Sequence, residues 1–186
     1  MKPTNKMIEE AVKQLQLGHV IAYPTEAVYG LGCDPGQLNA VEKLLQVKQR
    51  PADKGLILIA ANLEQLSPFI LPLEDEIAAR VIPTWPGFAT WLLPAQPTVS
   101  PLLRGAHDTL AVRVSSHPLV QTLCLAFGGA LISTSANRSG EVPLLNAQDV
   151  RTKWGKEVAY VCDSELGGYT KPSTIRDART GEIVRE

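Results

Sequence analysis

The chain has 186 residues and a formal net charge of −1, which allows one domain over residues 1–186 and excludes a general polycation. Its three cysteines and three histidines lack the spacing of a zinc site or a disulfide framework, so a reducing compartment is expected. No apolar run approaches the roughly 20 residues that cross a bilayer, so we expect a cytoplasmic protein with no membrane partner.

The first predicted elements are a helix and a buried strand. Apolar side chains at helical spacing predict a helix capped by Asn5, and residues 20–23 (VIAY) predict a strand covered on both faces. Residues 24–32 (PTEAVYGLG) then place Thr25 and Glu26 at the carboxyl end of that strand, where open α/β sheets bind ligands. The two glycines of this segment indicate either close approach of the backbone to a ligand or only a tight connection.

A cluster of cations follows the next helix. Residues 39–48 have apolar side chains at helical spacing, and residues 56–60 (LILIA) predict a buried strand. Lys48, Arg50 and Lys54 lie in the segment between them, at the edge of a rigid core, where binding residues are often placed. This segment is therefore a candidate site for an anion, although a solvated turn with ordinary surface cations would look the same.

The rest of the chain continues to alternate between helical patterns and short apolar runs, which is typical of an α/β fold. Residues 94–105 contain three prolines and little periodicity, so an irregular loop is expected there. The other expected elements are helices over residues 62–70, 73–82, 118–127 and 147–154, strands over 89–93, 109–114, 130–132 and 158–162, and a hairpin around 177–181.

An arginine interrupts the predicted strand over residues 109–114 (TLAVRV). Alternation places Thr109, Ala111 and Arg113 on one face of that strand. An arginine in an apolar strand is costly unless it has an anionic partner. The partner of Arg113 is either a carboxylate of the protein or a substrate carboxylate, which a planar guanidinium binds through two hydrogen bonds.

Polar residues gather after the predicted strand over residues 130–132. Residues 133–140 (STSANRSG) supply hydroxyls, an amide, an arginine and free backbone N–H groups at a strand end. Such loops are often only turns and caps, but the density of hydrogen-bonding groups favours a binding role here.

The candidate residues suit a ligand that carries several phosphates and a carboxylate. The pattern offers neither a general-base histidine nor a nucleophile triad, so catalysis would rest on positioning and charge stabilisation, as is usual for phosphoryl or nucleotidyl transfer. The set of candidates comprises Thr25, the Lys48, Arg50 and Lys54 cluster, Arg113, the loop over residues 133–137, Ser173 and Arg185.

Six ordered motifs resemble the YrdC/Sua5 family, within it the short single-domain bacterial threonylcarbamoyl-AMP synthases of the TsaC type. The resemblance covers nearly the whole chain. The motifs are PTEAVYGLG at residues 24–32, KQR at 48–50, WPG at 85–87, AVR at 111–113, STSANRSG at 133–140 and PSTI at 172–175.

The resemblance implies a YrdC-like α/β domain with a twisted mixed β-sheet, flanking helices and a deep positively charged cavity. It implies that L-threonine, bicarbonate or CO₂, and ATP are converted to threonylcarbamoyl-adenylate and pyrophosphate. This is the first step of threonylcarbamoyladenosine (t6A) synthesis at position 37 of tRNA. Partner proteins would transfer the threonylcarbamoyl group, and direct binding of tRNA or double-stranded RNA is also allowed. Mg²⁺ would be carried with ATP, without a metal site made of protein side chains.

Site residues follow from the positions that match the family's motifs. The resemblance implies that Lys48 and Arg50 are catalytic. It assigns ATP binding to Lys48, Arg50, Lys54, Thr109, Ser135, Asn137 and Arg185, and threonine binding to Thr25, Arg113, Ser133 and Ser173.

Three departures from the family pattern and two rival functions remain. Many relatives have Thr where this chain has Ala27, Pro where it has Phe88, and Val where it has Arg176. Ala27 removes a hydroxyl near the expected threonine site. The rivals are an RNA-binding or ribosome-assembly factor, and a carbamoyl-adenylate-forming domain of the hydrogenase-maturation kind.

Overall fold

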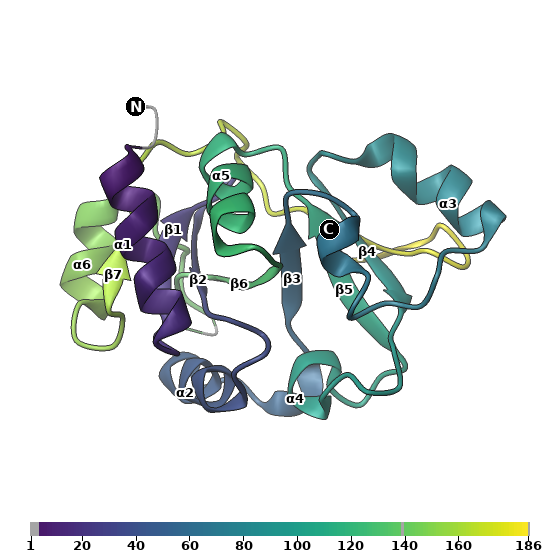
Figure 1. Ribbon diagram of the computed structural model, residues 1–186, viewed down its shortest axis with the longest axis horizontal. Helices are drawn as coiled ribbons and strands as arrows, with labels where there is room; N and C mark the ends of the chain where they lie inside the picture. The colour runs from purple at the N-terminus through teal and green to yellow at the C-terminus, as the bar shows by residue number, and fades with distance from the viewer. Residues whose placement is uncertain (1–3, 139, 186) are drawn as a thin grey trace.

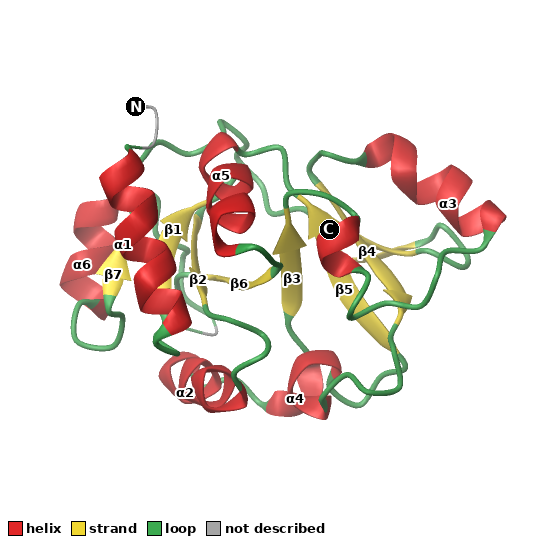
Figure 2. Ribbon diagram, viewed as in Figure 1, coloured by secondary structure: helices red, strands yellow, loops and turns green. Residues whose placement is uncertain are grey.

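The computed structural model describes residues 4–138 and 140–185, and within them nine strands form a single sheet (Figure 2). The strands lie in the order β7-β1-β2-β6-β3-β5-β4-β8-β9. Their bounds are β1 Ile21–Pro24, β2 Tyr29–Gly32, β3 Ile57–Ala60, β4 Ala89–Pro94, β5 Thr109–Val114, β6 Leu131–Ser135, β7 Tyr160–Val161, β8 Thr174–Asp177 and β9 Ile183–Arg185.

The sheet is mixed. The pairs β1–β7, β3–β5 and β4–β8 are parallel, and the other neighbouring pairs are antiparallel. Helices flank it, so the predicted α/β fold with a twisted mixed sheet is confirmed. The helices are α1 Asn5–Gln16, α2 Leu38–Lys48, α3 Asp75–Val81, α4 Pro101–Arg104, α5 Pro118–Phe127 and α6 Ala147–Trp154, with 3₁₀ turns at Ala52–Lys54, Glu64–Leu66 and Ile82–Thr84.

Two apolar clusters cover the two faces of the sheet, and the alternation of side chains along each strand divides them. In β3, Leu58 packs into the larger cluster with α2, α3, α4 and α6, whereas Ile59 packs into the smaller one with α1 and α5. Figure 1 shows α1 and α5 side by side over one part of the sheet. In β5, Leu110 and Val112 belong to the larger cluster, so Arg113 points to the opposite face.

The structure departs from the predicted elements at several points. Thr4 caps α1 in place of Asn5, because the Thr4 side chain accepts a hydrogen bond from the backbone N–H of Met7. Residues 29–32, expected within a loop, form strand β2, and residues 101–104, also expected within a loop, form the short helix α4. Asn146 caps α6 by accepting a hydrogen bond from the backbone N–H of Asp149, and the predicted hairpin is confirmed by the antiparallel pair β8 and β9.

In the part of the chain that the structure describes, no helix combines the length and the apolar character needed to span a membrane.

Candidate functional site

A cavity of about 390 Å³ collects most of the residues that the sequence singled out. Its wall is built from the β1–β2 turn, the segment after α2, the strands β5 and β6, and the C-terminal segment. The predicted residues that line it are Thr25, Arg50, Arg113, Ser133, Ser135, Asn137, Ser173 and Arg185. The others are Ala27, Val28, Gly30, Leu56, Ile57, Phe88, Thr134, Glu141, Pro143 and Pro172.

The β1–β2 turn forms one wall and is fixed by hydrogen bonds. Thr25 Oγ1 donates to the carbonyl oxygen of Val28 at 2.8 Å, so this hydroxyl already has a partner for its proton. The N–H groups of Gly167 and Tyr169 donate to the carbonyls of Thr25 and Glu26 at 3.1 and 3.0 Å. The C-terminal segment therefore holds the turn in place.

The glycines of β2 have two different roles. A Cβ atom at Gly32 would lie 2.0 Å from the carbonyl oxygen of Ile132, so close packing between strands requires this glycine. Gly30 lines the cavity, where a Cβ atom would lie 3.2 Å from Ser133 Oγ. Of the two glycines of β2, Gly30 is therefore the one that keeps space open beside the cavity.

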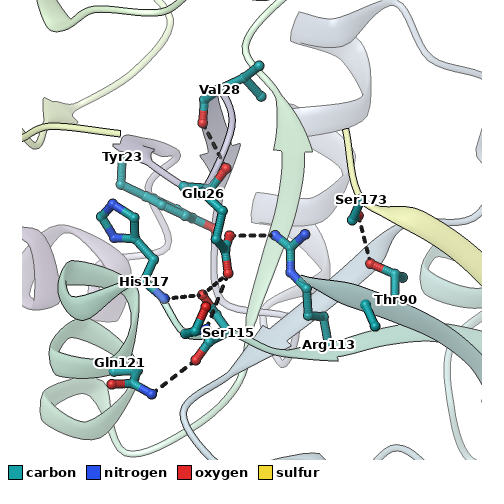
Figure 3. Close-up of polar contacts among 12 residues, drawn as sticks. Tyr23, Glu26, Val28, Thr90, Arg113, Ser115, His117, Gln121 and Ser173 are labelled. Carbon is teal, nitrogen blue, oxygen red and sulfur yellow. Dashed lines mark hydrogen bonds and ion pairs between the residues drawn. The ribbon is translucent and has the colours of Figure 1, made fainter. Parts of the chain in front are cut away.

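Arg113 has a carboxylate partner and also lines the cavity. Its Nη2 lies 3.2 Å from Glu26 Oε2, and both side chains are buried. Its Nε is buried and has no hydrogen-bond partner among the described residues, and its guanidinium carbon lies 5.4 Å from the centroid of the Phe88 ring. The structural ion pair is thus present, and Figure 3 shows the other terminal nitrogen pointing away from Glu26, towards the side of Ser173.

Glu26 stands at the centre of a buried network (Figure 3). Its Oε1 accepts hydrogen bonds from Ser115 Oγ at 2.7 Å and from the backbone N–H of Ser116 at 3.3 Å. His117, at the N-cap position of α5, is buried beside this network, and its Nε2 contacts the carbonyl oxygen of Glu165 at 3.0 Å. Burial lowers the pKa of His117, so this imidazole is neutral at pH 7.

Lys48 lies behind the cavity wall rather than in it. The side chain is only 5% exposed, and its ammonium donates to the carbonyl oxygens of Ser135, at 2.5 Å, and of Asn137. Burial, followed by the positive charge of Arg50, lowers the pKa of Lys48 to about 8. Lys48 therefore does not line the cavity, and its ammonium fastens the end of β6 and the loop after it.

That loop presents Ser135 and Asn137 to the cavity. Ser135 Oγ donates to Asn137 Oδ1 at 2.5 Å, and Asn137 Nδ2 donates to the carbonyl oxygen of Glu141 at 2.6 Å. The Glu141 carboxylate pairs with Lys153 and accepts a hydrogen bond from the N–H of Arg138. The loop is therefore fixed by the hydrogen bonds that the Lys48 ammonium donates to it and by the hydrogen bonds among its own residues.

Two more arginines, Arg50 and Arg185, line the cavity. Arg50 donates from Nη2 and Nε to the carbonyl oxygen of Gly55 at 2.9 and 3.2 Å. Burial lowers the pKa of Arg50, and the positive charge of Arg185 lowers it further, which places the two cations within electrostatic range of each other. Among the described residues neither arginine forms an ion pair with a carboxylate, although the charge of Asp53 acts on Arg50.

Besides Lys48, two predicted ATP-binding residues do not line the cavity. Lys54 is exposed at the end of a 3₁₀ turn, and Thr109 begins β5, paired with Pro94. Ser173 does line it, and its Oγ shares a hydrogen bond of 2.9 Å with Thr90 Oγ.

Comparisons with known proteins identify the family of the chain. A family model for Sua5, YciO and YrdC, described as telomere recombination, matches residues 13–186. The chain belongs to the Sua5/YciO/YrdC family. The threonylcarbamoyl-AMP synthase of Chromohalobacter salexigens is 52% identical over 185 residues, which are 100% of both chains.

Two solved structures of the family match the fold. E. coli YciO superposes with a TM-score of 0.87 at 28% identity, over 100% of this chain and 93% of that chain. P. abyssi Sua5, crystallised with L-threonine, superposes with a TM-score of 0.83 at 32% identity, over 91% of this chain and 50% of that one. The chain thus spans about half the length of that Sua5.

The sequence interpretation missed the role of Glu26. It noted this carboxylate at a strand end and noted that Arg113 needs an anion, but it did not connect the two. The available signal was one residue of each charge, Glu26 and Arg113, beside or within a predicted buried strand, although 87 positions separate the two in the sequence. Phe88, which stacks against Arg113, was noted only as a departure from relatives.

Proposed function

We propose that this chain is a threonylcarbamoyl-AMP synthase, which converts L-threonine, bicarbonate or CO₂, and ATP to threonylcarbamoyl-adenylate and pyrophosphate. The observation that carries the proposal is one cavity lined by an arginine that pairs with a buried carboxylate and by two arginines that form no such ion pair among the described residues. The full-length identity to synthases of the same size supports it.

The threonine subsite is assigned to the end that contains Arg113. Its guanidinium would bind the carboxylate of threonine, with the hydroxyls of Thr25, Ser133 and Ser173 around the rest of the amino acid. The relative crystallised with L-threonine is consistent with such a subsite. Ala27 lines the same wall without a hydroxyl, so the side chain of threonine would rely on the other three.

The phosphate subsite is assigned to Arg50 and Arg185. Ser135 and Asn137 would orient the nucleotide, and Lys48 would act by holding their loop. Lys54 and Thr109 would contribute less to ATP binding, because both lie outside the cavity lining. We propose that the cavity is positive overall, because its three arginines outnumber its one carboxylate, Glu141.

The reaction needs positioning more than acid–base chemistry. The neutral amine of threonine attacks CO₂ to form a C–N bond, and loss of a proton from the nitrogen leaves a carbamate. A carbamate oxygen then attacks the α-phosphorus of ATP, and the bond between that phosphorus and the pyrophosphate oxygen breaks. Arg50 and Arg185 would stabilise the negative charge that develops on the leaving pyrophosphate.

Mg²⁺ would supply further neutralisation of the triphosphate when it is bound to ATP. The described residues do not fit a resident metal, because they contain no group of three or more histidine, cysteine or acidic side chains that could hold an ion.

The product is a reactive mixed anhydride, so a partner protein must accept the threonylcarbamoyl group and pass it to adenosine 37 of tRNA. We place this activity in the cytoplasm, in agreement with three buried free cysteines. We further propose that residues 1–186 act as one domain and that contact with tRNA is made through the partner.

Pyrophosphate release tests the proposal. Release should require L-threonine and bicarbonate together with ATP, and mass spectrometry should detect threonylcarbamoyl-adenylate. An RNA-binding factor or a carbamoyl-adenylate-forming domain predicts no dependence on threonine. Release at the same rate without threonine would therefore refute the synthase.

A further inference from the structure

The three arginines of the cavity differ in what balances their charge. Arg113 pairs with the carboxylate of Glu26 at 3.2 Å. Arg50 donates to backbone carbonyls, and among residues 4–138 and 140–185 neither Arg50 nor Arg185 has a carboxylate partner. One cavity therefore contains a neutralised arginine and two that are not neutralised.

Glu26 is built into the protein so that its charge stays beside Arg113. The residue is 1% exposed, and Ser115 Oγ–H and the Ser116 N–H both donate to Oε1. Its backbone is fixed by the N–H of Tyr169, and a Cβ atom at Gly167 would lie 2.8 Å from its Cα. A carboxylate held in this way cannot swing away when a ligand enters (Figure 3).

We propose that Glu26 is a specificity-determining residue: it offsets the charge of Arg113, so that this end of the cavity selects a zwitterionic amino acid over phosphate. The inference rests on the function proposed above, because it assigns threonine to the Arg113 end. It goes further by naming what keeps the triphosphate of ATP out of that end.

The physical argument compares two ligands in the field of Glu26. A phosphate group carries a charge of about −1.5 to −2 at pH 7, whereas threonine carries one charge of each sign. A ligand that contacts Arg113 lies within several ångströms of the Glu26 carboxylate, which repels phosphate but both repels and attracts the zwitterion. At this range a unit charge changes the affinity for an anion by roughly 10-fold or more.

The test is Glu26→Gln, which keeps the shape of the side chain and its acceptor for Ser115 but removes the charge. Thermal shift and calorimetry would be run on the full chain with inorganic phosphate and with L-threonine. The dissociation constant for phosphate should fall by roughly 10-fold or more, and that for threonine should change less. Phosphate should also compete with threonine in the variant and not in the wild type.

Glu76→Gln is the matched control, because Glu76 also pairs with an arginine, Arg80, but on the exposed surface of α3. It should leave the affinities for both ligands unchanged. Equal phosphate affinity in the wild type and in Glu26→Gln would overturn the proposal. So would a parallel loss of threonine and phosphate binding with a lower melting temperature, since that pattern indicates a structural ion pair only.

A second variant covers the case in which Glu26→Gln does not fold alone. The double variant Glu26→Gln with Arg113→Gln removes both charges and should fold, because the defect would be the unpaired buried cation. Phosphate should then restore folding of Glu26→Gln but add nothing to the double variant. A double variant that also fails to fold would overturn the proposal. Wild-type protein that binds no threonine would refute the proposed function, whereas the phosphate measurements would still test Glu26.

Discussion

At one end of the cavity Arg113 is buried and pairs with Glu26, whereas at the other end Arg50 and Arg185 lie within range of each other's charge. The first end is complete without a ligand, because its cation and its anion are both supplied by the protein. The second end is incomplete, because two cations repel each other until an anion arrives. In the function proposed above, the placement of a single buried acid would separate a carboxylate subsite from a phosphate subsite within one cavity.

The largest effect should come from the unpaired end. Arg50→Ala should lower turnover by roughly 10²–10³-fold, because charge on the departing pyrophosphate would lose a preorganised donor. Its melting temperature should change little, since the hydrogen bonds that Arg50 makes are to the carbonyls of one neighbouring turn. Steady-state kinetics and a melting curve check both points.

Lys43→Ala is the control for that variant, because Lys43 is an exposed cation on the same helix that precedes the cavity. It should keep wild-type turnover. If Arg50→Ala instead melts early and keeps its turnover, the phosphate end is structural and the contrast between the two ends is lost.

A second effect concerns the pH dependence of stability. The pKa of Lys48 falls from 10.5 to about 8 in the folded protein, so the unfolded chain binds more protons between these values. The free energy of unfolding contributed by Lys48 therefore rises with pH from about 8 to 10.5. The cost of burying the ammonium, on the order of 3 kcal/mol, applies below pH 8 and disappears above 10.5.

Lys48→Met tests this sign. Urea unfolding of the wild type and of the variant should give curves whose difference grows in favour of the wild type across that pH interval. Lys43→Met, at an exposed position, should leave the slope of the wild type unchanged. Parallel curves for the wild type and Lys48→Met would mean that Lys48 reaches solvent and could act in the cavity directly.

Arg113→Lys tests the part of the cavity in which arginine pairs with Glu26. Lysine keeps the charge that Glu26 needs but loses the fork that binds a carboxylate through two hydrogen bonds. The affinity for threonine should fall by about 1.5–3 kcal/mol, with a much smaller change for ATP. Separate titrations of the two substrates, with a melting curve, measure this. Equal weakening of both would remove Arg113 from the threonine subsite.

The smallest effect is expected from the two residues that match ATP-contacting positions of the family but lie outside the lining. Lys54→Ala should change the KM for ATP by no more than about 5-fold, as for a solvated surface charge. Thr109→Ala should have an effect of the same size or smaller. A loss as large as that of Arg50→Ala would show that the phosphate end extends beyond the cavity described here.

Sequence patterns could predict what depends on neighbouring residues. The alternation in TLAVRV correctly placed Arg113 on the face opposite to Leu110 and Val112, and the strand before residue 133 correctly delivered Ser133 and Ser135 to the cavity. Both predictions use the period of a strand, which is local.

Other features could not be read in that way. Glu26 meets Arg113 only because the fold brings the β1–β2 turn to β5, although three strands separate β1 from β5 in the sheet, and no local pattern encodes that contact. The four residues of β2 include two glycines, so strand propensity is low, and pairing with β1 and β6 decides their conformation. The burial of Lys48 could have been predicted, since it continues the apolar stripe of Val41, Leu44 and Leu45 along α2.

The attachment of the β1–β2 turn by Gly167 and Tyr169 has a consequence for synthesis on the ribosome. Translation completes the turn early, but the segment that fastens it emerges almost at the end, and Arg185 later still. A nascent chain can therefore fold much of its sheet and remain unable to bind its ligands. Release of the polypeptide before residue 167 would leave a product that lacks the hydrogen bonds from Gly167 and Tyr169 to this turn.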